Sequence, residues 1–103
     1  MFLEPSFDES IAPDLGSRFV SDIRLKQNIK LISESPTRIP IYSFQYRDGI
    51  KLADNKELDT TSTFVGVMAQ DLLELAPHAV TKNEEDGYYR VDYSKIDVDF
   101  HKL

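Results

Sequence analysis

The stretch TFVGVMAQDLLELAP, residues 63–77, changes its hydrophobic period halfway along its length. Its first five residues are mostly apolar or β-branched, which favours a buried strand over residues 63–67. Beyond them the apolar residues follow the three- and four-residue spacing of a helix, and Pro77 ends the pattern. The residues on this spacing are Val65, Met68, Ala69, Leu72, Leu73 and Ala76. The stretch therefore predicts a strand that leads directly into an amphipathic helix.

The residues before this stretch predict further strands. Aromatic residues alternate in IYSFQYR, residues 41–47, as expected for a strand with one buried face. The dipeptide Asp48-Gly49 follows and favours a tight hairpin turn, so we expect residues 50–53 to return as a second strand. The polar residues 54–62 predict a loop. Pro36 and Pro40 exclude a long helix between residues 30 and 40.

The residues after the helix predict a short strand at 78–81, a charged turn that ends at Gly87, and a strand at 88–93. The expected fold is α+β: a small single domain of short antiparallel strands with one main helix. Residues 1–20 are acidic and rich in breakers, with Pro5, Pro13 and Gly16, and predict an extended N-terminal arm. We therefore divide the chain into an arm, residues 1–20, and a domain, residues 21–103.

Composition excludes several classes of function. A chain of 103 residues fits one domain. Its net charge of −6 makes nucleic acid an unexpected partner, and an apolar run long enough to cross a membrane is absent from the sequence. Cysteine is absent, and His78 and His101 lie far apart with few other ligands nearby. We therefore expect neither a bound metal nor a cofactor.

Ser21 and Lys26, in SDIRLK at residues 21–26, are the residues best suited to chemistry. A serine hydroxyl becomes a good nucleophile when a neutral lysine accepts its proton. Burial lowers the pKa of a lysine, and Ile23, Leu25 and Ile29 are available as apolar neighbours. Residues five apart share a face of neither a helix nor a strand, so the chain must bend between them, and Ser-Asp commonly opens such a bend. An ordinary turn followed by a basic surface segment explains the same residues.

Four segments in order carry a family resemblance: SDIRLKQNI at 21–29, VGVMAQD at 65–71, PHAV at 77–80, and DGY at 86–88 with VDYSK at 91–95. Together they resemble the intramolecular chaperone auto-processing domain found at the C-terminal ends of phage tail spikes, tail fibres and endosialidases. The resemblance implies a domain that assists trimeric folding of the protein upstream and then cuts itself off immediately before the serine.

On this resemblance the cut falls between Val20 and Ser21, with Ser21 as the nucleophile and Lys26 as the base. The reaction would occur once per chain, as a serine auto-endopeptidase with no external substrate. Other positions shared with the family motif are Asp22, Arg24, Gly66 and Gln70. We expect Asp22 and Arg24 to orient the site or to form an interface. For Gly66 and Gln70 we expect structural roles.

The resemblance also implies partners and a place of action. The chain itself is the first expected partner, as a homotrimer, and phage tail or fibre proteins are the second. The expected location is the host cytoplasm during assembly, and then the virion or tail. Since only 20 residues precede Ser21 and Met1 reads as a true start, two alternatives stay open. One is a non-cleaving structural protein of a virion or tail-like particle, attached through residues 1–20, and the other is a small binding module.

Overall fold

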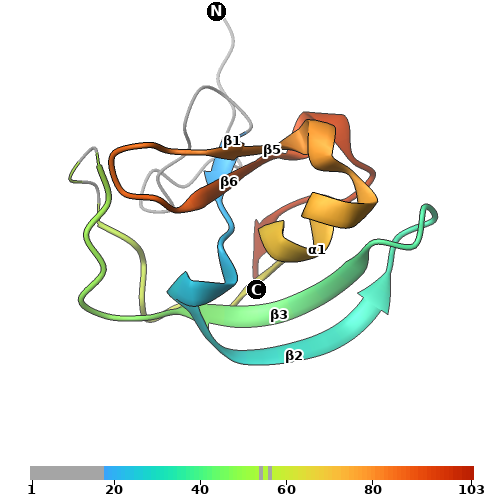
Figure 1. Ribbon diagram of the computed structural model, residues 1–103. Helices are drawn as coiled ribbons and strands as arrows, with labels where there is room; N and C mark the ends of the chain where they lie inside the picture. Colours follow the sequence, from blue (N-terminus) through green and yellow to red (C-terminus); the bar gives the residue numbers. More distant parts are fainter. Residues whose placement is uncertain (1–17, 54, 56) are drawn as a thin grey trace, which may run out of the picture.

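The structure is a computed structural model that describes residues 18–53, 55 and 57–103. Within these residues, seven short strands form two antiparallel sheets, and one α-helix, α1 (Ala69–Leu75), accompanies them. Figure 1 shows the two sheets as separate layers, with α1 beside the space between them. This arrangement confirms the predicted α+β fold of short antiparallel strands with one main helix.

The larger sheet has the strand order β2-β3-β4-β7. Its strands are β2 (Lys26–Glu34), β3 (Pro40–Tyr46), β4 (Phe64–Gly66) and β7 (His101–Lys102). β3 lies in the middle, because it pairs with β2 along one edge and with β4 along the other. Lys26 is the register partner of Tyr46 at the start of the β2–β3 pair. The pairing therefore holds Lys26 level with the last residue of β3.

The smaller sheet has the order β1-β6-β5. Its strands are β1 (Arg18–Val20), β5 (Val80–Lys82) and β6 (Tyr89–Asp92). Three 3-10 turns connect elements of the two sheets, namely η2 (Ile23–Leu25), η3 (Pro77–Ala79) and η4 (Tyr93–Lys95). β1 and β2 belong to different sheets and are separated by η2, so the segment around Ser21 crosses from one sheet to the other.

An aromatic core fills the space between the sheets. Phe44, Tyr46 and Phe64 are completely buried, and their rings pack with centroids 5.4 to 6.3 Å apart. Phe100 stacks on Phe64 at 5.4 Å and on Phe19 of β1 at 4.8 Å. Burial of large aromatic side chains is the main stabilising contribution in a domain of this size. These contacts join both sheets into one core.

Several predicted elements are confirmed, with small shifts of their ends. The strand predicted at 41–47 is β3, the strand at 63–67 is β4, and the helix before Pro77 is α1. The strands predicted at 78–81 and 88–93 are β5 and β6. The prediction of a hairpin at Asp48-Gly49 is wrong, since residues 50–53 form a turn and loop without strand pairing. Both edges of β3 are already paired with β2 and β4, so the edge it would need is occupied.

The last three residues of the predicted arm, residues 18–20, belong to the folded domain. They form β1, and Phe19 and Val20 are buried in the core with 5% and 1% of their surface exposed. The folded unit therefore includes residues upstream of Ser21. The rest of the predicted arm, residues 1–17, lies outside the described residues. Among those described, none of the helices is long and apolar enough to cross a membrane.

Candidate active site

The bend that Ser21 and Lys26 require is present and lies at η2. The side chain of Asp22 caps this turn by accepting a hydrogen bond from the backbone N–H of Arg24, at 2.9 Å. The backbone N–H of Leu25 donates to the carbonyl of Asp22, which closes the turn. Ser21 therefore precedes the turn and Lys26 follows it, and the two side chains can point to the same place.

Ser21 and Lys26 meet inside the protein. Lys26 Nζ lies 2.8 Å from Ser21 Oγ, and both residues are buried, with 1% and 0% of their surface exposed. The backbone carbonyl of Val67, just after β4, completes the cluster. It accepts hydrogen bonds from Ser21 Oγ at 2.6 Å and from Lys26 Nζ at 2.8 Å. This carbonyl positions both side chains, and the Ser21 hydroxyl points its proton at it in a hydrogen bond.

Burial lowers the pKa of Lys26 well below 10.5, while the negative charges of Asp22 and Asp71 oppose this effect. The apolar neighbours differ from those predicted. Leu25 is completely buried, but Ile23 and Ile29 are exposed at 41% and 38% and point into solvent. The ring of Phe44, with its centroid 4.0 Å from Nζ, lies against the amine instead. A lysine in these surroundings is suited to act as a neutral base.

Asp22 organises the segment on which the serine lies. Its buried carboxylate accepts hydrogen bonds from Arg24 Nε and Nη2, from Gln70 Nε2, and from the backbone N–H of Tyr89. Burial alone raises the pKa of Asp22, but these hydrogen bonds outweigh it and lower the pKa to about 2. Gln70 also accepts a hydrogen bond from the N–H of Ile23 at 2.8 Å. Asp22, Arg24 and Gln70 thus join η2 to α1 and β6.

The peptide group between Val20 and Ser21 is held on both sides. The N–H of Ser21 donates to the carbonyl of Tyr89 at 3.1 Å. The carbonyl oxygen of Val20 accepts a hydrogen bond from Tyr46 Oη, at 3.0 Å. Burial, with a smaller contribution from Tyr93, raises the pKa of Tyr46 well above 10, so the phenol keeps its proton. Sequence reasoning assigned this tyrosine only to a strand, and the alternation of aromatics in residues 41–47 could not reveal its partner.

Gly66 lies where another group approaches the backbone closely. A Cβ atom at this position would lie 2.6 Å from Tyr93 Oη and 2.9 Å from Cδ1 of Phe100. Tyr93 Oη accepts a hydrogen bond from the N–H of Val67, at 2.9 Å. The glycine therefore lets Tyr93 bond the N–H of Val67, the residue whose carbonyl oxygen contacts Ser21 and Lys26. This close approach gives Gly66 a structural explanation.

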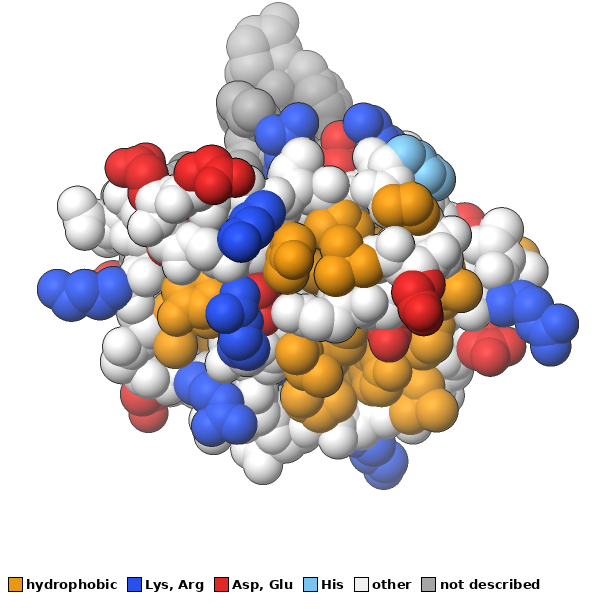
Figure 2. Space-filling view, viewed as in Figure 1, with side chains coloured by type: hydrophobic (Ala, Val, Ile, Leu, Met, Phe, Trp, Pro, Cys, Tyr) orange, Lys and Arg blue, Asp and Glu red, His pale blue; other side chains and the backbone are white. Residues whose placement is uncertain are grey.

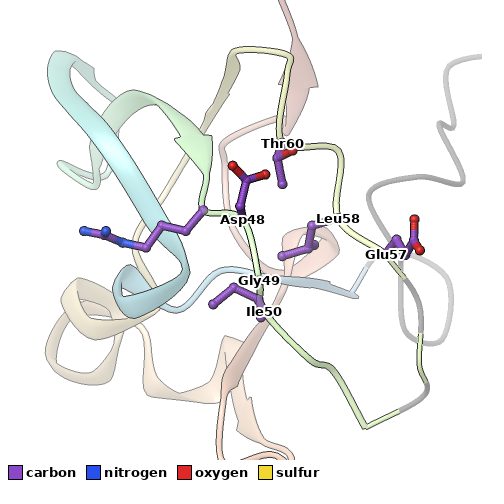
Figure 3. Close-up of a pocket in the computed structure, with 7 residues that line it drawn as sticks. Asp48, Gly49, Ile50, Glu57, Leu58 and Thr60 are labelled. Atoms are coloured by element: carbon purple, nitrogen blue, oxygen red, sulfur yellow. The ribbon is translucent and has the colours of Figure 1, made fainter.

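An external substrate would need an opening beside the dyad. A pocket of about 300 Å³ lies near the turn after β3, and its lining residues include Asp48, Ile50 and Leu58 (Figure 3). Ser21 and Lys26 do not line this pocket. The dyad is buried and lies next to the peptide bond that joins Ser21 to Val20.

Comparison with known families finds a match. The sequence profile of a peptidase family described as chaperone of endosialidase matches residues 21–81, more than half of the chain. The match begins at Ser21 and includes Lys26, Gly66 and Gln70. The DGY and VDYSK segments of the resemblance lie beyond it. Neither the curated proteins nor the solved structures contain a significant match to this chain.

Proposed function

The chain belongs to the chaperone-of-endosialidase family, and from that premise we propose that it cuts its own backbone once, between Val20 and Ser21. Ser21 is the nucleophile and Lys26 is the general base. The observation that carries this proposal is the 2.8 Å contact between Lys26 Nζ and Ser21 Oγ in a fully buried site. Its position at the first residue of the family match supports the assignment.

The first step is an acyl shift from nitrogen to oxygen. Lys26 accepts the proton of Ser21 Oγ, and the oxygen attacks the carbonyl carbon of Val20 to form a tetrahedral intermediate. The bond between the Val20 carbon and the Ser21 nitrogen then breaks. The nitrogen takes the proton held by Lys26, and an ester links Val20 to Ser21 Oγ. The hydrogen bond from the Ser21 N–H to the Tyr89 carbonyl supports this step, because it holds the leaving nitrogen in place.

The second step is hydrolysis of the ester by water. Water adds to the ester carbon with Lys26 again as base, and the collapse releases the Val20 carboxylate and the Ser21 hydroxyl. The products are residues 1–20, which include β1, and residues 21–103. Asp22, Arg24 and Gln70 act by positioning the segment that carries Ser21.

The test is the mass of the purified chain after folding. Wild type should yield the two pieces, while Ser21→Ala and Lys26→Ala should keep the full mass. Lys26→Arg should also stay intact, since arginine does not release its proton to act as a base. Lys30→Ala serves as a matched control, because Lys30 is exposed on the same strand and should not affect the cut. A folded wild-type chain that keeps its full mass would refute cleavage and favour a non-cleaving structural protein.

We further propose that the domain acts as a homotrimer and assists the assembly of a tail-fibre or tail-spike protein. Large hydrophobic side chains are exposed on β2 (Ile29, Leu31 and Ile32) and on α1 (Leu73 and Leu75). Figure 2 shows hydrophobic side chains gathered on the face that carries α1 and the β2–β3 pair. β2 is also an edge strand. Apolar surface of this kind supports self-association. Assembly in the host cytoplasm and later association with the virion follow from the same proposal.

A further inference from the structure

The carbonyl oxygen of Val20 is the atom that would gain negative charge when Ser21 attacks. An oxyanion of this kind needs a hydrogen-bond donor that is in position before the reaction begins. Among the described residues the structure places one such donor on it, the phenol of Tyr46, at 3.0 Å. Tyr46 is completely buried, so water does not compete with this hydrogen bond.

The orientation of the carbonyl follows from the pairing of β1 with β6. Val20 and Arg90 are register partners, and the next pair, Ser21 and Tyr89, is joined by the Ser21 N–H. Bonded and non-bonded pairs alternate in an antiparallel ladder, so Val20 belongs to a non-bonded pair. Its carbonyl therefore points away from β6 and towards the larger sheet, where the last residue of β3 is Tyr46.

The phenol itself is held firmly. Its ring packs against Phe44 and Phe64, with centroids 5.4 Å away in both cases. Tyr46 is also the register partner of Lys26, so one strand pair carries both the base and the donor. The base then approaches the serine from β2, while the donor reaches the carbonyl from β3. The peptide to be cut lies between them.

We propose that Tyr46 is a catalytic residue that stabilises the oxyanion on Val20 during self-cleavage. This inference rests on the proposed cleavage by Ser21 and Lys26. The phenol donates its hydrogen bond to the Val20 oxygen in the starting peptide, and the bond strengthens as the C=O becomes a C–O⁻. Collapse of the intermediate restores the carbonyl of the ester. The same donor then serves the second intermediate, which forms when water attacks the ester.

The test is the rate of cleavage after the chain is diluted from denaturant into folding buffer. Tyr46→Phe removes only the hydroxyl and keeps the ring, so the variant should fold and its cleavage should slow by about 100-fold. Tyr42→Phe is the matched control, because Tyr42 lies on the same strand and its hydroxyl donates to Asp71 instead. This control should cleave within about 2-fold of wild type.

Two further measurements separate catalysis from folding. In a Ser21→Ala background, which stays intact, the carbonyl ¹³C resonance of Val20 should move when Tyr46→Phe removes the hydrogen bond. Addition of hydroxylamine, which cleaves esters, should not rescue the Tyr46→Phe chain, because the ester itself forms slowly. Wild-type rate in a folded Tyr46→Phe chain would overturn the role of Tyr46 and leave the Ser21–Lys26 assignment standing. Absence of cleavage in wild type would overturn both.

Discussion

Replacing Asp22 by Asn in a chain that already carries Ser21→Ala should lower the free energy of unfolding by about 2 to 3 kcal/mol at pH 7. The Ser21→Ala background keeps the chain intact, so that cleavage does not complicate the measurement. Asn has the shape of Asp, and the change therefore tests the charge and the acceptor capacity of the side chain. Packing stays nearly constant.

The magnitude follows from the hydrogen bonds of the carboxylate. Oδ1 accepts from the backbone N–H and Nε of Arg24 and from Gln70, while Oδ2 accepts from Arg24 Nη2 and the N–H of Tyr89. Whichever carboxylate oxygen the amide nitrogen of Asn replaces, this nitrogen faces hydrogen-bond donors and cannot accept from them. The exposed guanidinium of Arg24 can turn to solvent, but the backbone N–H of Tyr89 cannot. Each buried donor left unpaired costs about 1 to 3 kcal/mol.

The pKa of Asp22 gives a second estimate with a definite sign. Its pKa falls from 3.8 in the unfolded chain to about 2 in the folded one. The resulting stabilisation is complete above pH 3.8 and is lost as the pH falls towards 2. Since one pKa unit corresponds to about 1.4 kcal/mol, the charged form contributes about 2 kcal/mol. Roughly half of this contribution should be lost by pH 3.

Urea unfolding at several pH values between 7 and 3 measures both quantities. The difference between the Ser21→Ala chain and its Asp22→Asn derivative should shrink by about 1 kcal/mol over that range. Asp99→Asn controls for net charge, because Asp99 is exposed, and it should change stability by less than about 0.5 kcal/mol. A difference that stays constant down to pH 3, or that is below about 0.5 kcal/mol at pH 7, would refute the reasoning.

Three other outcomes are expected. Gly66→Ala should destabilise the domain by about 1 to 3 kcal/mol in urea unfolding, because its Cβ would collide with Tyr93 Oη and Phe100; a change below about 0.5 kcal/mol would contradict the close approach. The cleavage rate should rise with pH, because Lys26 acts in its neutral form, and should level off well below pH 10.5; a tenfold rise per pH unit that continues to pH 10 would contradict a lowered pKa. Sedimentation at micromolar concentration should show a trimer that Leu31→Glu weakens, and a monomer throughout that range would exclude the proposed assembly.

The parts of the fold that sequence could predict are those with one buried face. In β3 buried Phe44 and Tyr46 alternate with half-buried residues, and α1 buries Ala69 and Leu72 while its last residues are exposed, so their apolar residues repeat with a recognisable period. β2 was not predicted, because all its residues from Asn28 onward are exposed and have no buried period. β1 and β7, with three and two residues, are too short to show a pattern. Their positions depend on pairing with distant strands.

The candidate site likewise has one part that the sequence could predict and another part that it could not. Ser21, Lys26 and the turn between them are close in sequence, and their types together with the family resemblance predicted the chemistry. The other two partners are distant: Tyr46 reaches Val20 across 26 residues, and the Val67 carbonyl reaches Ser21 across 46. Every residue except proline has the same backbone N–H and C=O groups, so a backbone acceptor leaves no signal in the sequence. Tertiary structure is needed to find it.

β1 lies upstream of the proposed cut and yet is part of the core. After cleavage, residues 18–20 would form the end of a separate peptide, residues 1–20, and would be held by β6 and by the stacking of Phe19 on Phe100. Removing Phe19 and Val20 from the core would cost roughly 3 to 6 kcal/mol, so departure of the upstream product would weaken the domain that released it. Rejoining the ends would require making a peptide bond from a carboxylate, for which the site has no energy source. Under the proposed cleavage, each copy of the domain would therefore be consumed by the single event it performs, and the number of molecules processed would equal the number of domains made.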